Sequence, residues 1–210
     1  MMKNNRCGAI CYIVGAGDFN ETFSAEKTDL VIAADGGYEK LIERGIRPDL
    51  LIGDLDSLGY EPDGVELIRH PVEKDETDTA LAYRLGYERG YRKFLVFGGT
   101  GGRIDHTIAN YCLLLRSCME GAEMSLIGGG TRAFVIRDSE ARLKGRCGAT
   151  VSVFAFGGKA CGVSIKGLRY SASDVTLTPE FPLGVSNSYT ESGEGTVSVR
   201  DGALLVIEEI

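Results

Sequence analysis

The sequence contains no tryptophan, only two histidines and only six cysteines among its 210 residues. No two cysteines form a C-x-x-C pair, and the histidines do not add the spacing of a zinc site. These absences exclude a disulfide-stabilised scaffold and a zinc-finger module. They favour a cytoplasmic protein whose thiols are reduced and mostly buried.

Long apolar runs and a basic balance of charge are also missing. No stretch approaches the roughly 18 apolar residues of a membrane span. The uncharged run from Cys7 to Gly17 follows Lys3 and Arg6 as in a short signal peptide, but we interpret it as a first strand. Lysine and arginine number 23 against 30 acidic residues, a net charge of −7. Such a chain binds polyanions poorly, so neither nucleic acid nor membrane is an expected partner.

Glycine, in contrast, is abundant: there are 29 glycines where average usage gives about 15. In the first part of the chain they separate alternating strand and helix patterns. The expected strands are Ala9–Val14, Leu30–Ala34, Asp49–Ile52, Val65–His70, Phe94–Phe97 and Met124–Ile127, and the expected helices are Tyr38–Arg44, Asp78–Arg89 and Asp105–Met119. This alternation predicts an α/β domain over residues 1–129, a parallel sheet with helices on both faces.

The pattern changes near Gly128-Gly129-Gly130, after which short strands and turns follow one another without a good helix. The expected strands are Ala133–Arg137, Thr150–Phe156, Gly162–Lys166, Thr196–Arg200 and Ala203–Ile207. We therefore predict a second domain over residues 130–210, a small antiparallel β-sandwich or barrel.

Acidic or glycine-rich loops follow five of the expected parallel strands. Their segments are Gly15–Asp18, Asp35–Gly37, Gly53–Asp56, Lys74–Asp78 and Gly98–Asp105. Ligands of open parallel sheets bind at the carboxyl ends of the strands, so these five loops converge on one candidate site.

Carboxylates in these loops suggest a metal. Asp54 and Asp56 project to the same side if the segment is extended, and Asp78 begins a helix that Thr77 can cap. Each alone also fits a structural role, a solvated turn or a partner for the helix dipole. Together, beside loops suited to phosphate, they call for a cation, and Mg²⁺ is the natural candidate.

The loop Gly98–Arg103 presents backbone N–H groups ahead of a helix, an arrangement that binds anions. Arg103 can add a bidentate phosphate contact, and Lys74 either contacts phosphate or is solvated. His106 could act as a base, but we interpret it as structural at the start of the helix. The glycine loops suited to phosphate also include Gly15, Gly17 and Gly99.

These motifs, taken in order, resemble thiamine pyrophosphokinase along nearly the whole chain. The matching segments are Ala34–Gly37, Pro48-Asp49 with Gly53–Ser57, Lys74–Asp78, Gly98–His106, Gly167–Tyr170 and Leu183–Asn187. Each is modest alone, but their order and separations are specific to that family.

The resemblance implies an enzyme that moves pyrophosphate from ATP to thiamine, giving thiamine diphosphate and AMP. It implies a homodimer in which an N-terminal domain binds ATP and a C-terminal domain supplies the thiamine surface across the interface. By the same likeness, Asp54, Asp56 and Asp78 hold Mg²⁺, and Asp35 and Asp105 line the same acidic pocket as candidate proton acceptors. Thr77, Gly102 and Arg103 contact ATP, together with Gly15, Gly17, Lys74 and Gly99 of the neighbouring loops. Ser186 and Asn187 lie at the thiamine ring.

One position departs from the family pattern. Many members carry tryptophan at the end of the Gly-Leu-Lys/Arg motif, where this chain has Tyr170. An aromatic face suits a cationic thiazolium, and tyrosine can serve. Two alternatives stay open: a related pyrophosphokinase acting on another heterocyclic alcohol such as a pterin, and a non-catalytic nucleotide- or thiamine-binding protein.

Overall fold

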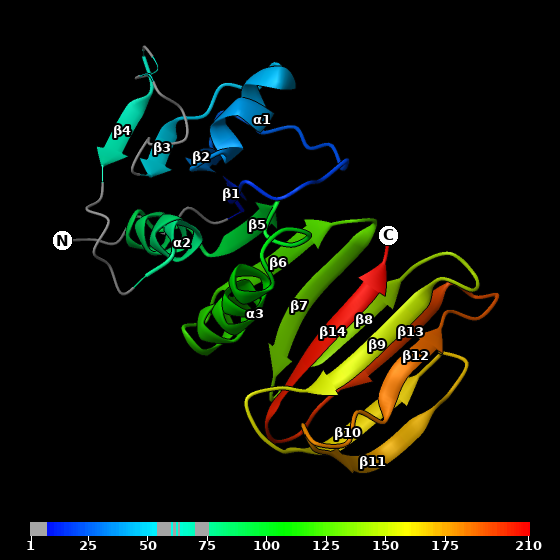
Figure 1. Cartoon of the computed structure of the whole chain (residues 1–210). Coiled ribbons are helices and arrows are strands. Elements are labelled where there is room, and N and C mark those ends of the chain that lie inside the picture. The colour runs from blue at the N-terminus through cyan, green and yellow to red at the C-terminus, as the bar shows by residue number, and fades with distance from the viewer. Residues whose placement is uncertain (1–7, 54–59, 61, 63, 70–75) are drawn as a thin grey trace. The chain divides into compact units, whose positions relative to one another are not determined.

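A computed structural model of the chain describes residues 8–53, 60, 62, 64–69 and 76–210 (Figure 1). The chain divides into two compact units. The first consists of Met1–Leu113 and Gly121–Gly129, and the second of Leu114–Glu120 and Gly130–Ile210.

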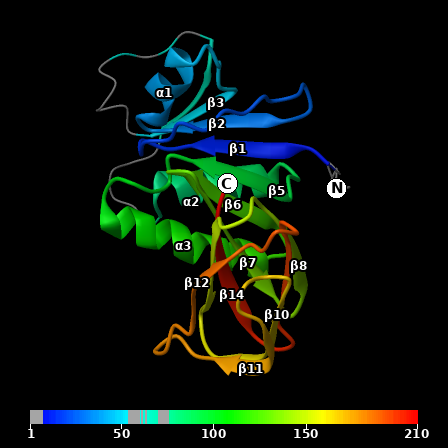
Figure 2. The same ribbon diagram turned by 90° about the vertical axis from the view of Figure 1, so that its right-hand side faces the viewer.

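The first unit is built on a parallel sheet. Its strands are β1 (Ile10–Val14), β2 (Leu30–Ala34), β3 (Leu50–Gly53), β4 (Glu66–Arg69), β5 (Lys93–Phe97) and β6 (Glu123–Gly128). They lie in the order β6-β5-β1-β2-β3-β4, and Figure 2 shows β1, β2 and β3 running side by side. Ile13 pairs with Ile32 on one side and with Val96 on the other, so β1 is central. All five residues of β2 are buried, as expected for a strand covered on both faces.

Helices cover both faces of this sheet, as the alternating pattern predicted. Helix α1 (Gly37–Glu43) packs Tyr38 and Leu41 into one cluster with Val14 and Val31. Helix α2 (Asp78–Glu88) lies on the opposite side, as Figure 1 shows. Strands β1 and β2 alternate their side chains between these two layers. The predicted α/β class is confirmed.

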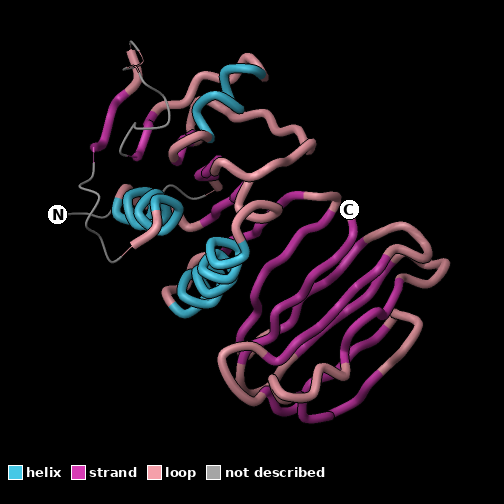
Figure 3. The backbone as a smooth tube through the Cα atoms, viewed as in Figure 1, coloured by secondary structure: helices cyan, strands magenta, loops and turns pink. Residues whose placement is uncertain are grey.

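The second unit is an antiparallel β-sandwich, shown in Figure 3 as strands joined by turns. One sheet has the order β12-β9-β14-β7, with β12 (Gly184–Ser188), β9 (Thr150–Ala155), β14 (Ala203–Glu209) and β7 (Thr131–Arg137). The other has the order β11-β10-β13-β8, with β11 (Ala172–Leu177), β10 (Ala160–Lys166), β13 (Glu194–Ser198) and β8 (Glu140–Lys144). Val153, Leu204, Val163 and Val197 from the two sheets share one core.

Three of these strands, β8, β11 and β12, were not predicted. Their sequences EARLK, ASDVTL and GVSNS are polar, and each buries a single residue. Antiparallel pairing holds them although hydrophobic alternation is weak. Helix α3 (Ile104–Met119) matches its prediction within one residue.

The expectation of mostly buried thiols is wrong. Of the five cysteines that the structure describes, Cys11 is buried, while Cys112 and Cys147 are exposed. Burial raises the pKa of the Cys11 thiol well above its usual range. No helix in the described part of the chain combines the length and apolar character needed to cross a membrane.

Candidate active site

The candidate site lies where the strand order of the first unit reverses. From β1 the chain runs outward through β2, β3 and β4, and it then returns to place β5 on the other side of β1. The carboxyl ends of β1 and β5 therefore flank the switch point, the place where open α/β sheets bind ligands.

Two glycine loops meet at this point. The N–H of Gly15 donates to the Phe97 carbonyl at 2.8 Å, and the N–H of Gly17 donates to the Gly98 carbonyl at 2.9 Å. A Cβ on Gly17 would stand 2.5 Å from the Gly98 carbonyl oxygen, and Gly98 itself has a left-handed φ of 62°. Only glycine permits so close an approach of the two backbones.

A cavity of about 240 Å³ opens beside these loops. Backbone and short polar side chains dominate its lining, which comprises Ala16, Gly17, Ala34, Asp35, Thr77, Asp78, Thr79, Gly98, Gly99, Thr100, Gly102, Arg103, His106, Thr107 and Asn110. The structure thus brings together most of the described residues that the sequence predicted for nucleotide and metal. Gly15 and Asp105 are absent from this lining. Asp54, Asp56 and Lys74 lie outside the described residues.

Helix α2 points its N-terminus at the cavity. Thr77 is its N-cap, and the Thr77 hydroxyl oxygen accepts a hydrogen bond from the Ala80 N–H at 3.2 Å. Asp78 follows in the first turn, where the helix dipole favours negative charge. Capping leaves other first-turn N–H groups oriented toward the helix end, which makes this end a suitable place for an anion.

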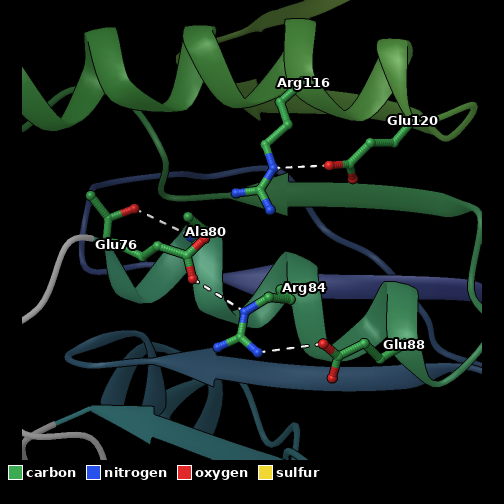
Figure 4. Close-up of polar contacts among 7 residues, drawn as sticks. Glu76, Ala80, Arg84, Glu88, Arg116 and Glu120 are labelled. Atoms are coloured by element: carbon green, nitrogen blue, oxygen red, sulfur yellow. Dashed lines mark hydrogen bonds and ion pairs between the residues drawn. The ribbon is translucent and has the colours of Figure 1, made fainter.

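Arg84 ties the segment that enters α2 to the body of the helix (Figure 4). Its Nε lies 3.2 Å from a Glu76 carboxylate oxygen, and its Nη1 lies 3.4 Å from Glu88, one turn further along. The same figure shows Arg116 of α3 paired with Glu120, which follows the end of that helix. The Arg116 Nε lies 3.0 Å from a Glu120 carboxylate oxygen. The Arg84 pairs restrain the approach to Thr77, the residue that caps the cavity-facing end.

Asp35 sits at the end of β2 in an unusual backbone conformation. Its φ is 49°, and its N–H donates to the Ile52 carbonyl at 2.8 Å, which ties the ends of β2 and β3 together. Its carboxylate occupies the space that a Cβ on Gly53 would need. A left-handed aspartate beside a cavity is a strained arrangement of the kind found at functional sites.

Arg103 and Asp105 form a bidentate ion pair. Arg103 Nη2 and Nε lie 2.6 and 3.1 Å from the two Asp105 carboxylate oxygens, and both side chains are exposed. The Arg103 hydrogen bond is the main reason that the pKa of Asp105 is lowered to about 2, and the His106 N–H adds to it. In this arrangement Asp105 is a weak proton acceptor, and Arg103 already binds one oxyanion.

Asn110 is a cavity residue that the sequence analysis missed. It is only 4% exposed, and its Nδ2 donates to the Gly99 carbonyl at 2.7 Å, which fixes the glycine loop to α3. Thr100 was likewise missed, and His106 lines the cavity although it was assigned a structural role. The available signal was spacing: His106 and Asn110 are four residues apart and share one face of a mostly apolar helix.

The second unit holds the residues expected at thiamine. Tyr170 and Asn187 line a pocket of about 300 Å³ with mostly apolar neighbours, among them Leu183 and Val185. Tyr170 is 61% exposed, whereas Asn187 is buried. Ser186 is exposed but is not among the pocket-lining residues, and it has a left-handed φ of 61°.

A metal cluster is not visible within the described ranges. No group of three or more His, Cys, Asp or Glu side chains there has the arrangement to hold a metal ion. Asp35 and Asp78 line the same cavity, and two further candidate ligands fall in the undescribed segment 54–59.

Comparison with known proteins gives consistent matches for both units. The family model described as "Thiamin pyrophosphokinase, catalytic domain" matches residues 23–126, and the one described as "Thiamin pyrophosphokinase, vitamin B1 binding domain" matches residues 136–204. The chain is 28% identical over 185 residues to the thiamine pyrophosphokinase of Bacillus subtilis (strain 168), a match that covers 85% of this chain and 86% of the relative.

Solved structures agree with these sequence matches. The crystal structure of the Bacillus subtilis thiamine pyrophosphokinase superposes with a TM-score of 0.85 at 25% identity, covering 95% of this chain and 98% of that one. The thiamin pyrophosphokinase of Geobacillus thermodenitrificans gives a TM-score of 0.83 at 24% identity, with 96% and 97% covered.

Proposed function

The chain belongs to the thiamin pyrophosphokinase family, and from this premise we propose that it transfers pyrophosphate from ATP to thiamine, giving thiamine diphosphate and AMP. The observation that carries the proposal is the cavity at the switch point between β1 and β5. It joins a glycine loop, the N-terminus of α2 and an arginine, three groups that bind phosphate for different physical reasons.

The nucleotide phosphates would bind against Gly17, Gly99 and Gly102 of the loops, Thr77 at the helix end, and Arg103. Lys74 is proposed as a further phosphate contact, and Gly15 supports the site by packing against the Gly98 loop. Binding would require Arg103 to exchange the Asp105 carboxylate for a phosphate, since its fork of donors fits one bidentate oxyanion.

Asp54, Asp56 and Asp78 are proposed to hold Mg²⁺. The described residues fit such an ion, because the carboxylate residues Asp78 and Asp35 line one cavity and Mg²⁺ prefers oxygen ligands shared with phosphates. When bound, the ion neutralises charge on the phosphate oxygens.

The reaction forms one bond and breaks another at the β-phosphorus of ATP. The hydroxyl oxygen of thiamine bonds to that phosphorus, the bond to the oxygen that bridges the α- and β-phosphates breaks, and AMP leaves. Holding the alcohol in line with the phosphorus supplies most of the acceleration. Asp35, which lines the cavity, is proposed to accept the alcohol proton. Asp105 can do so only once Arg103 has left it, because the ion pair lowers its pKa.

The functional division of the chain follows the same proposal. Residues 1–129 are the catalytic ATP-binding part, and residues 130–210 supply Tyr170 and Ser186 to thiamine, with Asn187 near them. We further propose a cytoplasmic homodimer in which one working site combines residues of two chains.

The activity is tested by incubating the protein with ATP, Mg²⁺ and thiamine and separating the nucleotide products. The expected result is AMP together with thiamine diphosphate in equal amounts. ADP as the product would contradict pyrophosphoryl transfer. AMP formation only with a pterin alcohol would favour the related pyrophosphokinase, and ATP or thiamine binding without turnover would favour a non-catalytic protein.

The shared site is tested by mixing two damaged homodimers, Asp54→Asn and Tyr170→Ala, at low thiamine. After unfolding and refolding together, half of the dimers are mixed, and each mixed dimer has one intact site if chains pair at random. Activity should return to about a quarter of wild type. If each site is built within one chain, nothing returns, and sedimentation as a monomer would also contradict the proposal.

A further inference from the structure

An irregularity in β12 sets the orientation of Asn187. Gly184 pairs with Val153 and Asn187 pairs with Val151, so two residues of β12 oppose the single Ser152 of β9. This is a β-bulge, and Ser186 within it has a φ of 61°. The Ser186 N–H donates to the Ser152 hydroxyl at 3.1 Å.

The bulge changes which side chain points inward. Val185 and Ser186 are both exposed, whereas Asn187 is only 5% exposed. Gly184 lies at the start of the bulge. Glycine is needed there because a Cβ would collide with the Val153 carbonyl oxygen. The extra residue therefore places a buried polar amide among mostly apolar pocket residues, where its hydrogen bonds have to be made internally.

Asn187 uses that amide to hold the backbone of Tyr170. Its Oδ1 accepts from the Tyr170 N–H and from the Ser188 N–H, both at 2.9 Å, and its Nδ2 donates to the Tyr170 carbonyl at 2.7 Å. An asparagine amide can make four hydrogen bonds, so these three leave little capacity for a ligand.

The segment that carries Tyr170 has further attachments to β12. The Arg169 N–H donates to the Ser188 carbonyl at 2.9 Å, and Leu168 forms a β-bridge with Tyr189. The Arg169 guanidinium carbon lies 5.6 Å from the centre of the Tyr170 ring. The backbone is thus held at both of its polar groups, while the Tyr170 ring remains 61% exposed at the pocket.

We propose that Asn187 is a positioning residue, which acts on thiamine through the Tyr170 backbone and not as a direct ligand. Its role for the substrate rests on the proposed function, but the clamp itself does not. Without the clamp, the Tyr170 segment would be in its binding-competent conformation only part of the time. The apparent affinity for thiamine would then be the intrinsic affinity multiplied by the competent fraction.

The absence of tryptophan allows a direct test. Tyr170→Trp introduces the only tryptophan of the chain at the clamped position, where it can be excited selectively over the remaining tyrosines, and its anisotropy reports the mobility of the segment. Adding Asn187→Ala should lower this anisotropy and raise the thiamine KM about tenfold, a tenfold fall in the competent fraction, with the ATP KM unchanged. Asn187→Asp has the same shape and keeps both accepted hydrogen bonds, so its effects on the anisotropy and on the thiamine KM should be intermediate. If the alanine variant does not fold, the aspartate variant serves as the test of the clamp.

Ser164→Ala is the matched control in the same Tyr170→Trp background. It removes the Ser164 hydroxyl, which accepts a hydrogen bond from the Asp174 N–H elsewhere in the second unit. It should leave both the anisotropy and the thiamine KM unchanged. Equal anisotropy in the Asn187 and Ser164 variants overturns the clamp, and a raised KM with unchanged anisotropy makes Asn187 a direct ligand. If the parent forms no AMP with thiamine, the proposed function fails while the anisotropy still decides the clamp.

Discussion

The two units differ in what forms their candidate binding sites: loops in the first and side chains of strands in the second. In the first, the cavity is formed largely by loops that follow parallel strands, and Gly17, Gly98 and Gly99 are among the residues that line it. In the second, the pocket is formed by side chains of antiparallel strands and their connections, such as Ile165, Val175 and Leu177.

The difference matches the chemistry that each surface can recognise. Backbone N–H groups at a helix end are fixed dipoles suited to phosphate charge. Phosphate binding is lost when a Cβ or a misplaced carboxylate occupies the space in front of them. An apolar pocket with one exposed aromatic ring recognises the shape of a ligand and a delocalised cation. Removing that ring weakens the binding of such a ligand.

Removing a proposed metal carboxylate should have the largest effect of all. Asp54→Asn, Asp56→Asn and Asp78→Asn should each lower kcat about 100-fold or more at saturating Mg²⁺, because the ion's stabilisation of phosphate charge is lost. Asp54→Asn and Asp56→Asn should not destabilise the free protein, since two like charges about 5 Å apart repel by roughly 3 kcal/mol. Asp78→Asn removes a charge that the dipole of α2 favours, so it should lower the stability by about 0.3–1 kcal/mol. Steady-state kinetics and urea unfolding measure the two quantities.

The matched control is Glu43→Gln, which removes an exposed carboxylate from α1. It should change neither kcat nor stability. Near-normal turnover in any of the three aspartate variants would remove that residue from the proposed metal site.

The close approach of the two glycine loops should make the first unit sensitive to one added methyl group. Gly17→Ala would put a Cβ 2.5 Å from the Gly98 carbonyl oxygen, and overpacking of this kind costs about 1–3 kcal/mol. Gly102→Ala is the control, because its Cβ meets nothing within 4 Å and its φ is not left-handed. Urea unfolding should show a lower midpoint for Gly17→Ala alone, and equal midpoints would contradict the packing account.

The fold of the first unit could be predicted from the sequence because its signals are local. Buried parallel strands such as Leu30–Ala34 are continuous apolar runs, and the loops after them contain glycine and aspartate at the turns. The topology then brings those loops together, so Gly17, Thr77, Asp78 and Arg103 could be placed at one cavity before the fold was known.

The second unit and the supporting residues were harder to predict because their roles depend on contacts distant in sequence. Strand β12 has the sequence GVSNS and is defined by its pairing with β9 and by a bulge, neither of which periodicity reveals. Asn110 donates to a backbone carbonyl 11 residues away, and Asn187 donates to one 17 residues away. Asparagine alone gives no signal for such a partner.

Loss of the exposed ring should affect one substrate only. Tyr170→Ala should raise the thiamine KM about tenfold and leave the ATP KM nearly unchanged, because a cation–π contact contributes about 1–2 kcal/mol. Tyr170→Trp should retain activity, since its larger face keeps the contact. Phe181→Ala removes an equally exposed ring of the same unit that is not among the pocket-lining residues, so it should change neither constant. An equal rise in both KM values after Tyr170→Ala would assign Tyr170 to the fold.

The smallest effect should come from separating Arg103 and Asp105. The ion pair lowers the pKa of Asp105 from 3.8 to about 2, and Arg103→Gln should return it toward the ordinary value in an NMR titration of the carboxyl carbon. Because the folded-state pKa is the lower one, the pair stabilises the fold above about pH 4, and that stabilisation is lost as the pH falls toward 2. Both side chains are exposed, so the melting temperature of the wild type should exceed that of Arg103→Gln only slightly above pH 4 and not at all near pH 2. Lys40→Met, which breaks the Lys40–Asp18 pair elsewhere in the first unit, should leave the Asp105 titration unchanged. An Asp105 pKa that stays near 2 without Arg103 would assign the shift to the His106 N–H, and Arg103 would then be free to bind phosphate without any change in the acidity of Asp105.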